Sequence, residues 1–178
     1  MKHIFSLPLL VALSILFVAT LYAAQPDPKG AFGFVWGDSP ATIKQKASAV
    51  KLNVVEGASK GNDILAYSGE IDQYRGLFRF ACHKNKLYTI SVSMADDGLF
   101  KKYDEILTEF TKTYGKPAEQ ETQNGLTVSG WNVGDTTVSV GKFNSTNNDT
   151  KEKEYITSIL FIQTSVEREV RKESAKKK

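Results

Sequence analysis

The sequence predicts an α+β fold in which helices pack on one face of an antiparallel sheet. Two segments have helical periodicity, several short runs alternate like strands, and each helix precedes a group of strands. The chain has 178 residues, of which 41% are hydrophobic and 24% charged. These proportions suit an ordinary globular domain rather than a disordered, collagen-like or disulfide-framework protein. We expect a linker at residues 25–30, one domain at 31–164, and a basic terminal helix or tail at 165–178.

The first 24 residues predict export. Lys2 and His3 precede an apolar run from Ile4 to Ala24, and Pro26 follows it closely, a pattern typical of a secretory signal peptide. The run is also long enough to span a bilayer as an uncleaved anchor. Both alternatives place the domain outside the cytoplasm, because the basic end stays inside. We therefore expect an exported, periplasmic protein.

The net charge of +3 comes from the end of the chain. The last twelve residues hold six Lys and Arg against three Glu, so residues 25–166 carry a net charge of −1. A nearly neutral body lacks the basic face that nucleic-acid binding requires. The basic tail indicates a solvated terminus, with attraction to anionic lipid head groups as the alternative. We expect membrane contact only through this tail or through an uncleaved N-terminal segment.

The first part of the domain predicts a strand and then a helix. Phe32, Phe34 and Trp36 alternate, which indicates a short strand with an aromatic face. Ser39 before Pro40 favours a helix start, because Ser accepts a bond from a free backbone N–H and Pro has none to lose. The apolar stripe of this helix is expected to consist of three residues: Ile43, Ala47 and Val50.

Strands are predicted at residues 64–71, 77–83 and 87–94, after a turn at 60–63. A three-residue loop, residues 84–86, would pair His83 with Leu87 and Phe80 with Ile90, which keeps apolar residues together. A two-residue loop would mix the two faces of the hairpin. The expected apolar face comprises Phe78, Phe80, Cys82, Tyr88, Ile90, Val92 and Met94.

The strongest helical pattern follows Asp96-Asp97-Gly98 and ends at Gly115, where a left-handed cap and Pro117 stop it. Apolar residues recur at steps of three and four; they are Leu99 or Phe100, Tyr103, Leu107, Phe110 and Tyr114.

The second group of strands is predicted at residues 126–133, 136–143 and 155–163. Gly134-Asp135 indicates a two-residue hairpin that pairs Val133 with Thr136. The polar stretch 144–154 is typical of a loop, and the last strand is apolar on both faces, which favours a central position. The chain thus reads as one domain or as two helix-plus-three-strand units, which share order and rough length but not residue identity.

The residue inventory argues against catalysis and against a metal or cofactor site. His3 belongs to the exported segment, so His83 is the one histidine left for a zinc site or a Ser–His pair. Zinc, nucleotide and nucleophile-elbow motifs do not occur in the sequence. Cys82, the single cysteine, lies far from the apolar segment and cannot form an internal disulfide or a lipid anchor. We expect no enzyme, with no catalytic, cofactor-binding or metal-binding residues and no cofactor.

Four features have a functional and a structural interpretation. Cys82 is a reactive thiol or, as its apolar face favours, a buried and inert one. Asp96-Asp97 is part of a carboxylate site or caps the following helix. Trp36 and Trp131 grip a ligand or belong to the core, as their apolar neighbours favour. The triplets starting at Asn144 and Asn148 match the glycosylation pattern but are common in polar loops.

Several short motifs are similar to those of known proteins. They are Phe-Gly-Phe-Val-Trp-Gly-Asp-Ser-Pro at residues 32–40, Lys86-Leu87-Tyr88, and Tyr-Gly-Lys-Pro at 114–117. Together with Trp131 and Gly134 they resemble small exported bacterial proteins of unassigned function. More distantly, the chain resembles the BamE outer-membrane assembly lipoproteins and the beta-lactamase-inhibitor-protein fold. The resemblance implies non-enzymatic interaction modules. The chain departs from BamE in lacking a lipid-attachment cysteine.

The sequence therefore predicts an exported, non-enzymatic binding protein of the cell envelope, whose partner is another envelope protein. The alternative is a periplasmic carrier of a small apolar ligand held between sheet and helices. A third interpretation, an enzyme that uses only carboxylates and Lys, Arg or Tyr, would need acidic residues to converge in one cleft. Partner identity, oligomeric state and binding residues are left open.

Overall fold

A computed structural model describes residues 27–60, 63–146 and 151–176 of the chain. The predicted signal peptide or anchor lies outside these described residues. The described part contains three helices, namely α2 (Pro40–Ala49), α3 (Lys101–Tyr114) and α4 (Thr164–Ala175). Within it, no helix combines the length and the apolar character needed to cross a bilayer.

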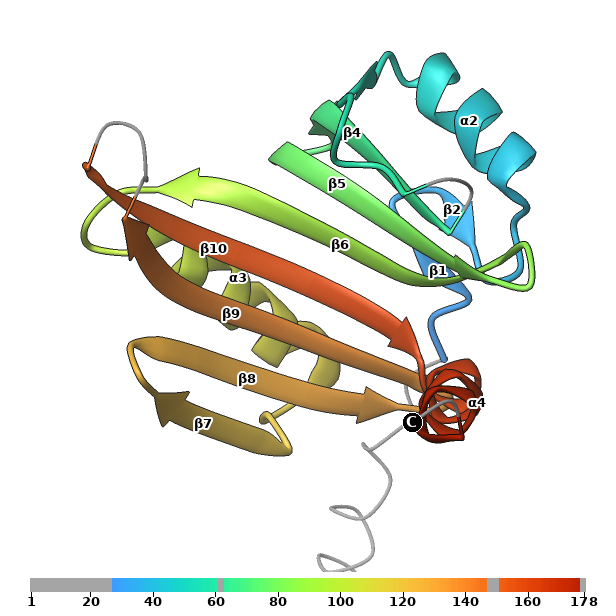
Figure 1. The fold of residues 1–178 in the computed structure, drawn as a ribbon. Coiled ribbons are helices and arrows are strands. Elements are labelled where there is room, and N and C mark those ends of the chain that lie inside the picture. The colour runs from blue at the N-terminus through green and yellow to red at the C-terminus, as the bar shows by residue number, and fades with distance from the viewer. Residues whose placement is uncertain (1–26, 61–62, 147–150, 177–178) are drawn as a thin grey trace, which may run out of the picture.

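The strands form one large antiparallel sheet and one small hairpin (Figure 1). The first four strands of the sheet are β3 (Asn53–Val54), β4 (Ile64–Ile71), β5 (Tyr74–His83) and β6 (Lys86–Asp96). The other four are β7 (Glu119–Gln123), β8 (Leu126–Val133), β9 (Thr136–Thr146) and β10 (Lys153–Gln163). Their order is β3-β4-β5-β6-β10-β9-β8-β7, so the chain has the predicted α+β class.

The order of elements repeats along the chain. Helix α2 precedes β3 to β6, and helix α3 precedes β7 to β10. The last strands of the two series, β6 and β10, pair at the centre of the sheet. Strands β3 and β7 were not predicted, because each is exposed at a sheet edge and has no apolar alternation.

The β5–β6 hairpin corrects the predicted loop and part of its register. His83 pairs with Lys86, so the turn has two residues, Lys84 and Asn85, both with positive φ. A bulge after Ala81 then restores the predicted pairing of Phe80 with Ile90. The extra residue lets a two-residue turn and an apolar face coexist. Leu87, fully buried, therefore takes the place on the apolar face that was predicted for Tyr88.

The second group of strands follows the prediction more closely. Val133 pairs with Thr136 and Trp131 with Val138. Strand β10 is central, between β6 and β9. The predicted polar loop at 144–154 is wrong over part of its length, because β9 continues to Thr146 and β10 begins at Lys153. Residues 147–150 lie outside the described residues, as does part of the turn predicted at 60–63.

Buried residues of the sheet form one core cluster with residues of α2 and α3; the side of the strands that carries Phe78, Phe80, Ile90 and Val92 is here called the covered face. Phe110 of α3 lies with its ring centroid 5.9 Å from that of Trp131 and 6.0 Å from that of Phe161. Ile106 is more deeply buried than Leu107, so the buried stripe of α3 is rotated slightly from the predicted one. The covered-face core comprises, among others, Phe78, Phe80, Ile90, Val92, Val138, Val140, Ile159 and Phe161.

Helices α2 and α3 lie where the sequence predicts them, with small differences at their ends. The Ser39 hydroxyl accepts a bond from Thr42 N at 3.2 Å, and Pro40 is the first residue of α2. Val50, predicted to be on the buried stripe, is 43% exposed because it caps the helix end. Gly115 caps α3 with a φ of 80°, which favours glycine.

The predicted aromatic strand at residues 32–36 is instead a tight hairpin. Strands β1 (Gly30–Ala31) and β2 (Phe34–Val35) pair around Phe32 and Gly33, which both have positive φ. The aromatic side chains nevertheless face the core as expected: Phe34 is buried, while Phe32 and Trp36 pack against the core cluster.

Candidate functional site

The face of the sheet opposite the covered face, here called the open face, carries few charges on its three central strands. Alternation along each strand places every second residue on this face. These residues are half-buried or exposed, except for the buried Gly141. They are Thr89, Ser91, Ser93 and Ala95 on β6, Ile156, Ser158, Leu160 and Ile162 on β10, and Thr137, Ser139, Gly141 and Phe143 on β9.

Small side chains gather in the middle of the open face. One cross-strand row runs from Leu77 through Ser93, Ser158 and Gly141 to Val128. A Cβ added at Gly141 would lie 3.3 Å from the Ser158 hydroxyl oxygen. The row is thus shallow at its centre and apolar at both ends, so a partner's backbone can approach the strands closely.

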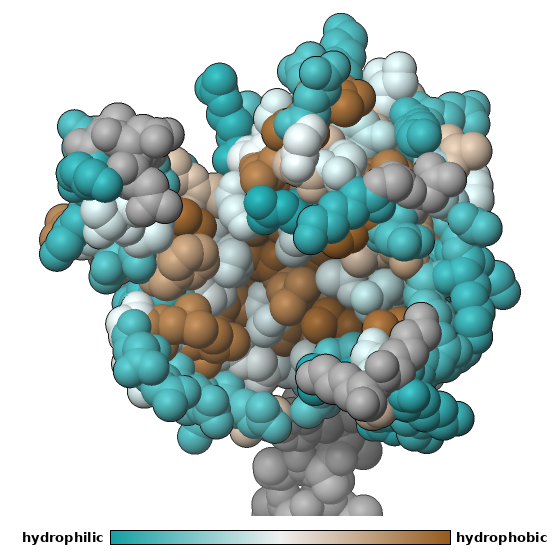
Figure 2. All heavy atoms as spheres, viewed as in Figure 1, coloured by the Kyte–Doolittle hydropathy of each residue, from teal (hydrophilic) through white to brown (hydrophobic). Residues whose placement is uncertain are grey.

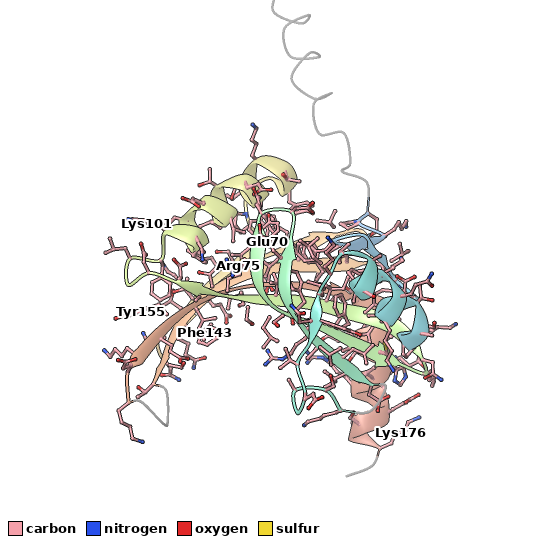
Figure 3. The ribbon with its side chains drawn as sticks, turned by 90° about the horizontal axis from the view of Figure 1, so that it is seen from above. Glu70, Arg75, Lys101, Phe143, Tyr155 and Lys176 are labelled. Atoms are coloured by element: carbon pink, nitrogen blue, oxygen red, sulfur yellow. The ribbon has the colours of Figure 1, made fainter. Side chains whose placement is uncertain are left out.

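The open face is also hollowed. Figure 3 shows the sheet bent into an arch, with Phe143 and Tyr155 on one arm and α4, ending near Lys176, on the other side. Figure 2 looks into this arch and shows apolar side chains gathered in the middle of the face, surrounded by hydrophilic ones. An apolar, concave patch with a hydrophilic border is typical of a binding surface.

The two borders of the open face carry opposite charges. Arg79 of β5 pairs with Ser91 at one end of a cross-strand row, and Glu119 of β7 pairs with Gly130 at the other. Among the described residues, neither side chain forms an ion pair. From β5 to β7 the face spans five strand spacings, roughly 24 Å. This row of the surface is therefore polarised along its width, whereas nearer the β4–β5 turn an acidic residue, Glu70, lies opposite Arg75 on the same border.

Helix α4 is fixed to the sheet at two hairpin turns. Asp135, in the β8–β9 turn, accepts a bond from Ser165 N at 2.9 Å at the start of the helix. Lys84, in the β5–β6 turn, donates to the carboxylates of Glu169 and Glu173. These contacts hold α4 as a wall beside the open face.

Contacts with α4 also create the one group among the described residues whose side chains are suited to hold a metal ion. His83 Nε2 lies 3.8 Å from the Glu169 carboxylate and 3.5 Å from that of Glu173. However, the Lys84 ammonium already bridges the two carboxylates. It lowers the pKa of both glutamates, and they raise the pKa of Lys84. One cation of the chain itself thus already occupies the space between the two carboxylates and offsets one of their two negative charges.

Cys82 lies on the covered face and is 6% exposed. Burial, with smaller effects from Asp63 and Asp38, raises the pKa of its thiol to about 11. A protonated, buried thiol is a poor nucleophile, in keeping with the inert interpretation.

The Asp96-Asp97 pair bonds to the backbone ahead of α3. Asp97 Oδ1 accepts from Leu99 N at 3.0 Å, and Asp96 Oδ2 accepts from Tyr103 N at 3.2 Å. Asp96 also accepts from the Thr157 hydroxyl at 2.5 Å. These partners satisfy free N–H groups at the helix start, which is the capping role.

Neither tryptophan lies on the open face. Trp131 is buried, and its Nε1 donates to Gly115 O at 2.8 Å. Trp36 is half-buried, and its Nε1 donates to Pro28 O at 2.9 Å. The first glycosylation triplet, at Asn144, lies at the end of β9; the second, at Asn148, falls outside the described residues.

Sequence reasoning missed the open face because it weighed aromatic, acidic and cysteine residues one at a time. The signal was present in the alternation itself: the positions facing away from the core in residues 89–95 and 137–143 hold Ser, Thr, Gly, Ala and Phe instead of charged residues.

No protein-family model matches this chain, and no curated protein or solved structure has significant similarity to it. The resemblance to small exported bacterial proteins and to BamE stays a prediction.

Proposed function

We propose that this protein is an exported, non-enzymatic binding protein of the cell envelope, located in the periplasm, and that its open face holds a segment of another envelope protein. The observation that carries this proposal is the concave, uncharged centre of the face over β6, β10 and β9. When a sheet face is exposed to water and has no binding role, its outward-facing positions are commonly charged, because charged residues keep the surface soluble. Here charge is confined to the borders.

The chemistry of the face defines the occupant. The segment would be apolar in its middle, acidic where it meets Arg79, and basic where it meets Glu119. Rim charges of this kind set orientation and the rate of association. A helix of about 16 residues spans roughly 24 Å, so one amphipathic helix laid across the strands matches the width of the face.

The proposal includes the finer architecture. Helices α2 and α3 would cover one face of the sheet, in two successive units that each begin with a helix. This is supported by the burial of Ile43 of α2 and Phe110 of α3 in one core cluster. Such an arrangement leaves the opposite face available to a partner.

Site-specific crosslinking in cells tests the proposal. The photoreactive residue benzoylphenylalanine replaces Ala95 or Asn132, two exposed positions at opposite ends of the open face. Matched controls carry it at Thr108 or Lys112, exposed on α3. We expect both open-face positions to crosslink to the same protein, and the α3 positions not to.

A charged residue placed in the middle of the open face provides the second part of this test. Leu160→Arg should abolish the crosslinks from both open-face positions, because an unpaired charge would be buried under the partner. Thermal unfolding checks that the variant folds, and Ser139→Lys replaces it if it does not. Crosslinks that persist in the folded variant, or that form equally from α3, would contradict the proposal.

A second candidate function, the carriage of a small ligand, is favoured by one observation. Helix α2 and strands β3 and β4 line a cavity of about 620 Å³ that is open to solvent on one side. This cavity is separate from the open face, so the two functions do not compete for residues.

A further inference from the structure

The cavity beside α2 lies between the helix and the edge of the sheet, where Figure 1 shows α2 alongside β4. Its buried floor consists of Leu52, Leu65 and Tyr67. Val54, at its mouth on β3, is 66% exposed. A volume of about 620 Å³ falls within the range of roughly 300–1,000 Å³ typical of small-molecule sites.

The helix contributes a polar, basic wall to this cavity. Lys44, Ser48 and Lys51 line it; Lys44 and Ser48 lie one turn apart on the same side of α2, and Lys51 follows the end of the helix. Within the described part of the chain, neither lysine forms an ion pair. The described lining includes no acidic residue, so its charged members are two exposed lysines at the border of an apolar floor.

Tyr67 adds a hydrogen-bond donor to the lining of this cavity. Its side chain is 4% exposed and packs on Phe80, with ring centroids 6.0 Å apart. Among the described residues its hydroxyl has no hydrogen-bond partner. Burial raises the pKa of Tyr67, so the hydroxyl stays protonated and can donate. The hydroxyl oxygen is not among the fully buried polar atoms without a partner, so it is open to the cavity, where an oxygen atom of a ligand would accept its hydrogen bond.

We infer that this cavity binds an anionic amphiphile, with its aliphatic chain on Leu52, Leu65 and Val54 and its carboxylate or phosphate near Lys44 and Lys51. The Tyr67 hydroxyl would donate to an oxygen of the head group. The inference rests on the second candidate function and is independent of the open face. It replaces the purely apolar ligand predicted from sequence with a charged one, because unpaired lysines flank the cavity.

Isothermal titration calorimetry with the purified chain tests the ligand class. The probes are dodecanoate below its micelle concentration, dodecanol, and dodecyltrimethylammonium. We expect dodecanoate to bind at least tenfold more tightly than dodecanol, the cationic probe not to bind, and dodecanoate affinity to fall with added salt. Equal binding of dodecanoate and dodecanol would overturn the anionic class while leaving carriage of an apolar ligand intact. Binding of none of the probes would overturn both.

Paired variants locate the site. Lys44→Gln with Lys51→Gln should weaken dodecanoate binding at least tenfold and leave dodecanol binding unchanged. Lys112→Gln with Lys116→Gln, on exposed positions at the end of α3, is the matched control. Tyr67→Phe should weaken dodecanoate several-fold, since it removes one hydrogen bond. Unchanged binding in the Lys44 and Lys51 double variant would overturn the site.

An anionic head group with an aliphatic chain could belong to a membrane lipid or to a free amphiphile, and binding to vesicles distinguishes the two. Sedimentation with phosphatidylglycerol vesicles that depends on Lys44 and Lys51 assigns the ligand to a membrane lipid. Dodecanoate binding without such sedimentation assigns it to a free amphiphile. Sedimentation that is unchanged in the double variant, with no dodecanoate binding, contradicts the inference.

Discussion

The two helices that accompany the sheet fill the space beside them to different degrees. Helix α3 has 14 residues and α2 has 10. The buried residues of α3 are Tyr103, Ile106 and Phe110, whereas those of α2 are Pro40, Ile43 and Ala47. The large side chains of α3 pack against Trp131 of β8 and Phe161 of β10, whereas a cavity of about 620 Å³ lies beside α2. The half of the sheet beside α2 (β3 to β6) and the half beside α3 (β7 to β10) thus share the order of their elements but differ in how tightly the helix is packed.

The largest expected effect comes from removing a large side chain of α3 from the core. Phe110→Ala removes a ring that contacts Trp131, Phe161 and Tyr114. We expect it to lower the free energy of unfolding by about 3–5 kcal/mol, through lost burial and a residual cavity. Urea denaturation measures this. A loss below about 1 kcal/mol would mean that α3 is not tightly packed and that the comparison fails.

The reactivity of the Cys82 thiol tests whether solvent reaches the core beside α2 at positions outside the cavity. With a pKa of about 11 and 6% exposure, Cys82 should react with dithionitrobenzoate at pH 8 at least about 100-fold more slowly than a free thiol of pKa ~8.5. Urea should restore the normal rate. Fast labelling of the native protein would show that the core beside α2 opens readily.

The same substitution in both halves sharpens the comparison further. Ser129 is fully buried beneath α3 and lies 3.1 Å from the Tyr103 hydroxyl, so Ser129→Leu should overpack the core and cost about 1–3 kcal/mol. Ser48 lines the cavity of α2, and Ser48→Leu should change stability by less than about 0.5 kcal/mol. Thermal unfolding compares the two variants. Equal losses would mean that the cavity closes in solution.

Much of the fold could be predicted because local patterns carry it. The alternation at residues 64–71, the Gly134-Asp135 turn and the Ser39-Pro40 helix start each correspond to an observed element. The errors arose where the pattern alone is ambiguous. Strand β7 is wholly exposed, so pairing at the sheet edge, and not its own residues, defines it. The bulge in the β5–β6 hairpin shifted Leu87 into the place expected for Tyr88.

The candidate sites were harder to predict than the fold. The cavity beside α2 is lined by residues from the helix, from β3, from β4 and from the loops between them, and no sequence pattern reports empty volume. The contact of Lys84 with Glu169 joins residues far apart in the chain, which periodicity does not reveal. The open face was readable in principle, since its uncharged positions alternate with the core residues of the same strands.

The smallest expected effect concerns α4, which bridges the two halves. A hydrogen bond from Lys84 lowers the pKa of Glu169 and Glu173 from an ordinary value near 4.5. Because the folded-state pKa is lowered, the stabilisation is present above that ordinary value and is lost as pH falls through the folded-state values. We expect hydrogen-exchange protection of α4 to stay level from pH 7 to about pH 5 and to decline below about pH 4.

Two variants separate the attachments of α4. Lys84→Gln should remove the acid-dependent step and loosen the last turns of the helix, which contact the half that contains α2; Lys86→Gln, on the same hairpin, is the matched control. Asp135→Asn should instead loosen the first turn, because Asp135 accepts from Ser165 N. If Lys84→Gln loosened the whole helix equally, α4 would be docked through its Val166 and Val170 side chains as one unit, and the two halves would not hold it independently.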